Sequence, residues 1–297
     1  KLLIITLFII SFQTNQSKVF AEKKYSFDDF GLISIMYHRF NESKYPSTNI
    51  QMDVFKKQLD IIESEGIKFI HPKDFKKSLS ENKKDRKILL TIDDGLLSFY
   101  KNAWPILKKK EIPFILFVNT REVGSFNYMN WDQIREMSRA GVIIANHMVE
   151  HPYMLEIGSD ETDADWINRL QNELLVAESR IEQETGQSHR YLAYPYGEFD
   201  LEIKLMLKNN GFIGLAQNSG AIGVNSDFLA LPRFPLASIY ANLDTAKIKL
   251  DTKAFNVELV EPKSPVTKIR SPSVTLKFDE GNHNLSQIGC FANSKPL

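Results

Sequence analysis

Two adjacent carboxylates follow an apolar stretch that is typical of a β-strand. The run over 88–92 leads directly into Asp93, Asp94 and Gly95. Buried carboxylates are costly unless something pairs with them, and neighbouring strand residues point to opposite faces. A turn at Gly95 would let both side chains reach a pocket at the strand end. The alternative is an Asp-Gly turn in which one acid caps the next helix.

A pair of histidines four residues apart follows a second such run, over 142–145. His147 and His151 can bind one metal ion if the backbone between them turns. Together with the two aspartates they would supply three metal ligands and a general base. Because Cys290 is the only cysteine, any metal must be held by His, Asp or Glu. The alternative is two solvated loop histidines.

A third strand-like run ends in the residues Tyr194, Pro195, Tyr196 and Gly197. The aromatic rings could form a wall against a sugar, and a backbone N–H near Gly197 could face an oxyanion. We take Tyr194, Pro195 and Trp131 as candidate substrate-binding residues. Ordinary strand packing followed by a proline turn is the alternative.

These three segments belong to a longer alternation of strand-like and helix-like stretches. Between the strand-like runs lie stretches with helical spacing, including one over 165–185 that should end at Gly186. The alternation predicts parallel pairing through right-handed crossovers, and the apolar runs indicate strands covered on both faces. The strand-like runs occupy 32–37, 67–70, 88–92, 114–118, 142–145, 191–194, 212–216 and 228–231.

The fold class that follows is α/β. Our first choice is a distorted (β/α) barrel of 7–8 parallel strands, whose strand order can be permuted, and our second is an open doubly wound sheet. Both folds place the active site beyond the C-terminal ends of the strands. The three segments that carry chemistry lie at such ends.

The composition is that of a globular protein with a substantial core. The 297 residues carry 37 basic and 37 acidic side chains, and charged residues make up 25% of the chain. A net charge of zero argues against bulk nucleic-acid binding, which needs a basic surface to displace counterions. We therefore expect no nucleic-acid partner.

The first 21 residues differ in character from residues 22–255, which we assign to the catalytic domain. They begin with Lys1, continue as an apolar run and end at Ala21, the pattern of a secretory signal peptide. The run is short for a membrane span and no later segment is longer, so we expect no transmembrane span in the mature chain. The mature protein should be periplasmic or secreted; an uncleaved membrane anchor is the alternative.

Prolines become frequent after about residue 255. We expect 256–297 to be a linker and a small β extension, with strand-like runs over 274–278 and 287–291. Cys290 lies in the second run and is expected to be a buried, small hydrophobic side chain.

The motifs TIDDG, HMVEH and AYPYG occur in that order over 91–197. In this order they resemble the polysaccharide deacetylase family, also known as the NodB-homology domain or carbohydrate esterase family 4. The run Ile35–Arg39 resembles the start of the branch that contains the poly-β-1,6-N-acetylglucosamine N-deacetylases. The resemblance covers roughly residues 30–250.

The resemblance implies a metal-dependent hydrolase that removes N-acetyl groups from an N-acetylglucosamine polysaccharide of a biofilm or cell envelope and releases acetate. Its partners would be the N-acetylated glycan and, as a further option, envelope or export proteins. The metal would be zinc, with cobalt, manganese or iron as alternatives. The implied residues are Asp93 as general base, Asp94, His147 and His151 as metal ligands, the backbone N–H of Tyr196 at the oxyanion, and His38 as general acid.

Two positions depart from the family's motifs. Met148 follows the first histidine, where the family usually has Ser or Thr, so a hydroxyl that fixes the loop is absent. Ala193 begins the third motif, where the family commonly has Arg. The base would then need another orienting partner, and Arg233 is our candidate; a surface arginine is the alternative reading.

Two other functions compete with the deacetylase. The segment from His147 to His151 also matches H-x-x-E-H, a metalloprotease motif that requires a helix and would use Glu150 as the base. Pro152 disfavours helical geometry at His151. A non-catalytic carbohydrate-binding module would instead use Trp131, Tyr153, Tyr194 and Tyr196 as a platform and would tolerate loss of Asp93.

Overall fold

A computed structural model of the chain describes residues 31–80, 85–254, 257–278, 288–292 and 295–296. These residues fall into two units: a main unit within Phe27–Gly281, and a C-terminal unit that holds the described residues from 288 onward. The predicted signal segment 1–21 lies outside the described residues. No helix in the described part is both long enough and apolar enough to span a bilayer.

A nine-stranded sheet forms the centre of the main unit. Its order is β10-β1-β5-β6-β7-β8-β9, with β4 beside β5 and β11 beside β1. Every strand but β10 pairs in parallel with a neighbour, so eight of the nine described strands fit the predicted 7–8 parallel strands. The bounds are β1 Leu32–Tyr37, β4 Lys68–Phe69, β5 Lys87–Ile92, β6 Phe114–Val118, β7 Ile143–Asn146, β8 Tyr191–Ala193, β9 Ile213–Leu215, β10 Ala221–Ile222 and β11 Phe234–Pro235.

A short segment joins the two edges of this sheet. Leu231 bridges Leu215 of β9, and Phe234 then pairs with Ile35 of β1. The sheet is therefore curled into a distorted barrel, as predicted. The strand expected over 228–231 is reduced to the single bridge at Leu231, and closure depends on this bridge and the two-residue β11.

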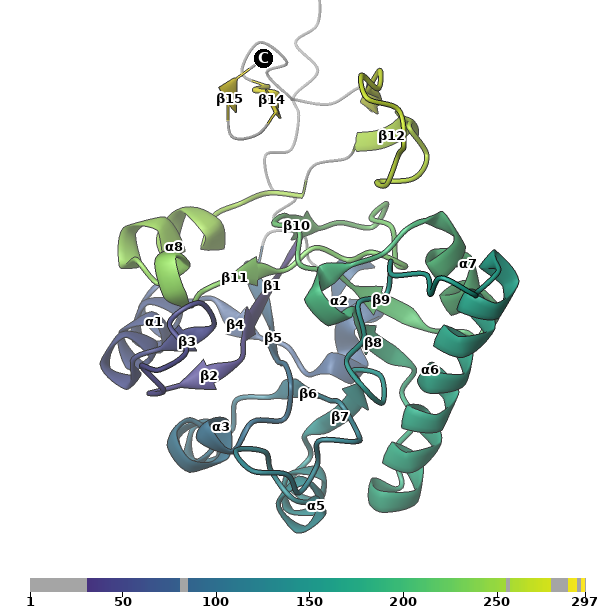
Figure 1. Cartoon of the computed structure of the whole chain (residues 1–297). Coiled ribbons are helices and arrows are strands. Elements are labelled where there is room, and N and C mark those ends of the chain that lie inside the picture. Colours follow the sequence, from purple (N-terminus) through teal and green to yellow (C-terminus); the bar gives the residue numbers. More distant parts are fainter. Residues whose placement is uncertain (1–30, 81–84, 255–256, 279–287, 293–294, 297) are drawn as a thin grey trace, which may run out of the picture. The chain divides into compact units, whose positions relative to one another are not determined.

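Helices surround the curled sheet on the outside (Figure 1). On α1 the apolar face is buried through Phe55, Leu59 and Ile62. The predicted long helix is α6, and Gly186 ends it in a left-handed conformation with φ 70°. The bounds are α1 Met52–Ser64, α2 Phe75–Ser80, α3 Leu97–Asn102, α4 Trp104–Lys109, α5 Trp131–Arg139, α6 Asp163–Thr185, α7 Leu201–Asn209 and α8 Leu243–Leu250. Three 3₁₀ turns cover Pro72–Asp74, Pro195–Gly197 and Ser238–Tyr240, and the short parallel strands β2 Arg39–Phe40 and β3 Asn49–Ile50 pair with each other.

Alternation along each strand separates two apolar clusters. One cluster fills the barrel interior with side chains from seven strands, among them Leu89, Phe117, Ala145, Ala193 and Leu215. Their sequence neighbours on β5 and β6, such as Leu90 and Val118, pack outward under the helices in a second cluster. A residue that continues the interior series past a strand end therefore faces the mouth of the barrel.

The region after residue 255 differs in part from the prediction. The strand expected over 274–278 is present as β13, Thr275–Phe278, but it pairs with β12, Val257–Glu261, in a stretch that we predicted to be linker. In the C-terminal unit β14, Phe291–Ala292, pairs with β15, Lys295–Pro296. Cys290 is exposed, so the prediction that it is buried is wrong. The described strands beside it are two residues long and offer no core to bury it.

Candidate active site

A buried ion pair stands at the end of β5. Asp93 and Arg233 are both fully buried. The guanidinium donates from Nη1 to Oδ1 at 2.8 Å and from Nη2 to Oδ2 at 2.9 Å, which fixes both oxygens of the carboxylate. Arg233 is therefore not a surface residue, and it lies where an orienting partner for Asp93 would have to lie.

Three further contacts hold the guanidinium of Arg233. Its Nε donates to the carbonyl of Ala216 at 2.8 Å, and its Nη1 donates to Oγ1 of Thr91 at 3.1 Å. The ring of Phe117 lies under the guanidinium, 5.6 Å from ring centroid to Cζ. Thr91, which sequence reasoning missed, lies two residues before Asp93 and so shares its face of β5.

The charge of Asp93 is set by these neighbours. Burial alone would raise the pKa of this carboxyl, but the positive charge of Arg233, followed by His38 and His147, lowers it below the usual value. Nε2 of His38 lies 3.7 Å from Oδ2 of Asp93. Asp93 is therefore an ionised acceptor beside an imidazole.

Asp94 points to a different set of partners because the backbone turns at this residue. Asp94 has φ 72° and Gly95 has φ 71°, two successive left-handed residues. The next helix, α3, is capped by Leu96 with no side-chain hydrogen bond, so neither aspartate caps it. This turn lets both carboxylates reach the mouth of the barrel from one strand end.

Asp94, His147 and His151 form a three-residue cluster. Oδ1 of Asp94 lies 3.3 Å from Nε2 of His147 and 3.7 Å from Nε2 of His151. One ligand atom from each of the three residues lies within 4.8 Å of the others. The spacing suits a single metal ion.

The orientation of His147 fits a metal ligand. Its Nδ1 lies 2.7 Å from the carbonyl oxygen of Ala193, which can only accept, so Nδ1 carries the proton of the neutral ring. Nε2 is buried and has no hydrogen-bond partner among the described residues, since its approach to Asp94 is not aligned as a hydrogen bond. Burial lowers the pKa of His151 to about 4, which keeps that ring neutral near pH 7. Both rings can therefore offer a lone pair to a cation.

The loop that carries the two histidines is not a helix. Met148 has φ 67° and His151 has φ 54°, and Glu150 turns outward to pair with Arg121. The H-x-x-E-H interpretation needs one helical face that holds both histidines and the glutamate. The metalloprotease reading is therefore wrong for this chain.

Asn146 fixes this loop in place of the hydroxyl that Met148 lacks. Its Oδ1 accepts from the backbone N–H of Met148 at 2.9 Å. Its Nδ2 donates to the carbonyl of Leu174 at 2.9 Å and to the buried Glu178 at 3.0 Å, both on α6. Sequence reasoning missed Asn146 and Glu178, although a polar residue that ends β7 was a usable signal.

Tyr196 forms the outer wall of the cluster. It has φ 55°, and its ring is 48% exposed. The ring meets His151 edge-on at 4.5 Å between centroids and stacks on Tyr153 at 4.2 Å with an interplanar angle of 9°. Two exposed tyrosines thus stand beside the metal cluster.

The three residues predicted to bind substrate lie elsewhere. Tyr194 is fully buried, its hydroxyl donates to the carbonyl of Leu229 at 2.6 Å, and its ring stacks on Phe199. Pro195 is also buried. These two side chains pack in the core, so neither can lie against a sugar. Trp131 is half-buried at the start of α5 with Arg180 of α6 over its ring, a contact between helices.

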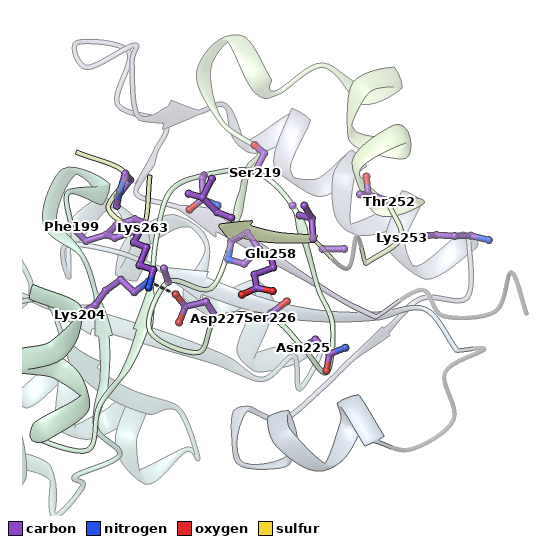
Figure 2. Close-up of a pocket in the computed structure, with 18 residues that line it drawn as sticks. Phe199, Lys204, Ser219, Asn225, Ser226, Asp227, Thr252, Lys253, Glu258 and Lys263 are labelled. Atoms are coloured by element: carbon purple, nitrogen blue, oxygen red, sulfur yellow. Dashed lines mark ion pairs between the residues drawn. The ribbon is translucent and has the colours of Figure 1, made fainter. Parts of the chain in front are cut away.

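A cleft of about 740 Å³ lies on the main unit between the loop over 218–232, the start of α7 and the β12 segment. Figure 2 shows its polar lining, in which Lys204 forms an ion pair with Asp227. Phe199, the ring that Tyr194 supports, contributes to its wall. The aspartates and histidines described above do not line this cleft.

Comparison with known proteins agrees with this geometry. Residues 80–214 match the family described as polysaccharide deacetylase. The poly-β-1,6-N-acetyl-D-glucosamine N-deacetylase of Staphylococcus epidermidis is 24% identical over 263 residues, which cover 78% of this chain and 91% of that protein. A putative polysaccharide deacetylase of Bacillus subtilis, YxkH, is 23% identical over 67% of this chain and 69% of its own length.

Two solved structures share the fold. IcaB from Ammonifex degensii superposes with a TM-score of 0.62 at 26% identity and covers 74% of this chain and 95% of its own. The Streptococcus pyogenes deacetylase PplD gives a TM-score of 0.64 at 23% identity, over 75% of this chain and 98% of its own. Both confirm the barrel-like architecture.

The buried ion pair of Asp93 and Arg233 predicts how far substitution of either residue lowers the free energy of unfolding. Arg233→Met should lower the free energy of unfolding by about 3–5 kcal/mol, because it leaves Asp93 charged and unpaired in the core. Adding Asp93→Asn to that variant should restore part of the loss. Urea unfolding of the two single variants and the double variant measures this coupling. Additive losses would show that the two side chains do not interact.

The same pair predicts a dependence of stability on pH. The pKa of Asp93 is lower in the folded chain than the value of about 4 in an unfolded chain. The folded state therefore binds fewer protons, and this contribution to stability is present above about pH 4 and is lost as the pH falls through the folded pKa. Between about pH 6 and pH 3, wild type should lose more unfolding free energy than the Asp93→Asn, Arg233→Met variant. An equal loss of unfolding free energy in both proteins over this pH range would contradict a lowered pKa for Asp93.

Proposed function

Because residues 80–214 match the polysaccharide deacetylase family, we propose that the chain hydrolyses the N-acetyl groups of poly-β-1,6-N-acetylglucosamine and releases acetate. The observation that carries this proposal is the mouth of the barrel, where Asp93 and the cluster of Asp94, His147 and His151 meet. The choice of linkage rests on the Staphylococcus epidermidis relative, which matches nearly its whole length. It also rests on His38, which follows β1 and lies beside Asp93.

The cluster would hold one divalent cation, with zinc as our first choice and cobalt, manganese or iron as alternatives. The buried, unpaired Nε2 of His147 and the adjacent carboxylate of Asp94 supply the borderline and hard donors that zinc accepts. Such a cation supplies Lewis acidity, which polarises water and the acetamide oxygen.

Asp93 acts as the general base. Arg233 holds both carboxylate oxygens in fixed positions, so the proton acceptor does not rotate when water approaches. The proton moves from the attacking water to Asp93 while the new C–O bond forms at the acetamide carbon. The lowered pKa makes Asp93 a weak base, and its role therefore depends on water that has already been polarised.

His38 acts as the general acid. It lies 3.7 Å from Asp93, and its side chain is 14% exposed, so it can exchange protons with solvent. It gives a proton to the glucosamine nitrogen as the C–N bond breaks. The immediate products are acetic acid and a free amine, because Asp93 takes up one proton while His38 gives up one. Acetic acid then ionises to acetate by losing its proton to the amine or to solvent, so atoms and charge balance.

Tyr196 and Tyr153 position the sugar. Their stacked rings present an exposed aromatic face next to His151, against which the apolar face of a pyranose ring can pack. The backbone N–H of Tyr196 would help to bind the oxyanion, a contribution of about 3–4 kcal/mol for one good donor. The rings of Tyr196 and Tyr153 thus have the substrate-binding role that we predicted for Tyr194 and Pro195.

The polymeric substrate suits a protein that works outside the cytoplasm. We keep residues 1–21 as a signal peptide, residues 22–255 as the catalytic domain, and a periplasmic or secreted location as parts of this proposal. A carbohydrate-binding module without catalysis remains the competing function. The two are distinguished by turnover, because acetate release needs Asp93 as a proton acceptor, whereas glycan binding needs it only for the stability of the fold.

Acetate release from β-1,6-linked N-acetylglucosamine oligomers tests the function. The zinc-loaded protein should release acetate, a chelator should stop it, and Asp93→Asn should lower kcat by at least about 100-fold because the proton acceptor is lost. Asp132→Asn, a change of the same kind at an exposed position on α5, is the matched control and should leave kcat unchanged. Binding of the oligomers without acetate release would favour the carbohydrate-binding module.

Replacement of His38 tests the general acid. His38→Gln should lower kcat by about 100-fold or more while zinc affinity stays the same, because His38 lies outside the three-ligand cluster. His71→Gln is the control. His71 lines a cavity with Pro113 and Val142, which directly precede β6 and β7 and so lie at the end of the barrel away from its mouth. Full activity in His38→Gln would remove His38 from the mechanism.

A further inference from the structure

The interior face of β6 ends in a polar side chain that the reaction described above does not use. Ile115 and Phe117 belong to the barrel interior, whereas Val118 packs outward, so Asn119 is the next residue of the interior series. The same alternation gives Asp93 at the end of β5 and His147 past the end of β7. Three neighbouring strands thus each end in a polar residue at the mouth of the barrel.

Strand register places Asn119 between the two halves of the site. Val118 pairs with Asn146, and the N–H of His147 donates to the carbonyl of Val118 at 3.0 Å, so Asn119 lies alongside His147. On the other side, a Cβ on Gly95 would lie 3.2 Å from Val118, which shows how closely the turn after Asp94 approaches β6. Asn119 is therefore adjacent to the segments that carry both metal ligands and base.

The side chain of Asn119 is buried without full hydrogen bonding. It is 3% exposed, and its Oδ1 has no hydrogen-bond partner among the described residues. An unpaired buried acceptor costs about 1–3 kcal/mol, and an apolar residue at this position would avoid the cost. The only other such atoms in the described part of the chain are Nε2 of His147, which a metal would engage, and Oγ of Ser34 on β1.

Tyr128 closes the same side of the site. Its backbone N–H donates to Ser125 at 3.0 Å, and it bridges Leu96, just after the Asp-Asp-Gly turn. Burial and then the charge of Asp94 raise the pKa of its phenol, whereas a hydrogen bond from Asn119 acts the other way. The phenol thus lies near both side chains.

We propose that Oδ1 of Asn119, backed by Tyr128, accepts a hydrogen bond from an N–H or O–H donor of the bound N-acetylhexosamine, next to the acetamide that reacts. This inference rests on the proposed function and extends it to a specific binding contact. A neutral carboxamide suits the task, because it pairs with a neutral sugar donor without adding charge beside Asp93 and Asp94. The unpaired acceptor is then satisfied only when the correct substrate is in place.

Kinetics on two substrates distinguish this substrate-binding role of Asn119 from a role in metal binding or in the stability of the fold. The β-1,6-linked N-acetylglucosamine oligomers carry N–H and O–H donors, whereas 4-nitrophenyl acetate carries neither but still presents an acetyl group. Asn119→Leu, which keeps the approximate volume, should lower kcat/KM for the oligomers by about 10- to 100-fold and leave kcat/KM for the ester within about twofold. Asn119→Ala is the second variant and should show the same selectivity if the leucine is not accommodated.

Ser34→Ala is the matched control, because it removes the other unpaired buried side-chain atom from the barrel interior without touching the mouth. It should leave kcat/KM unchanged for both the oligomers and the ester. Zinc affinity, measured by calorimetry, should be equal in all variants. An equal loss on both substrates, or weaker zinc binding in Asn119→Leu, would overturn the assignment and give Asn119 a structural role.

Failure of the proposed function has a different signature. If wild type hydrolyses the ester but releases no acetate from the oligomers, the substrate class is wrong and the contact proposed for Asn119 falls with it. If wild type is active on both substrates and the variants keep their activity on the oligomers, only the Asn119 proposal fails.

Discussion

The arrangement of the site depends on one buried ion pair. Asp93 directly follows β5, and Arg233 lies in the segment that joins β9 to β1. Their bidentate contact therefore connects a strand in the middle of the sheet to the segment that closes it. Neither charge reaches solvent, and neither could stay in the core without the other. The pair therefore stabilises the curled sheet and fixes the proton acceptor with the same atoms.

A second constraint, the backbone turn at Asp94, gives the adjacent carboxylates of Asp93 and Asp94 different partners and different functions. The left-handed backbone at Asp94 turns its side chain toward His147 and His151, while Asp93 stays with Arg233. Two acids that shared one partner would repel each other, and one of them would take up a proton. Here each has its own positive or potentially positive partner, so both can remain ionised. An oriented but weak base beside a cation site is consistent with hydrolysis of a stable amide.

Much of this could be predicted from the sequence because it depends on local patterns. Apolar runs placed β5, β7 and β8 to within a residue, and the residues that follow them were read as strand ends. Contacts between distant residues were harder. Arg233 lies 140 positions from Asp93, and only the missing arginine at Ala193 pointed to it. Tyr194 was misjudged because its burial depends on Phe199 and Leu229, which no local pattern reveals.

Other features had no usable signal in the sequence. Cys290 was expected to be buried from residue type alone, and the short strands beside it provide no core. The β12 strand was hidden by the prolines around it. Asn119 was not singled out from the sequence, and its importance appears only when burial, register and the lack of a partner for its Oδ1 are considered together.

The most direct test of the account is a crystal structure of the zinc-loaded protein, with the metal located by anomalous scattering. We predict one zinc ion bound by Asp94, His147 and His151, with Asp93 outside the coordination shell and still paired with Arg233. Zinc ligated by Asp93, or no zinc at the three-residue cluster, would contradict the division of labour between the two aspartates on which the mechanism depends.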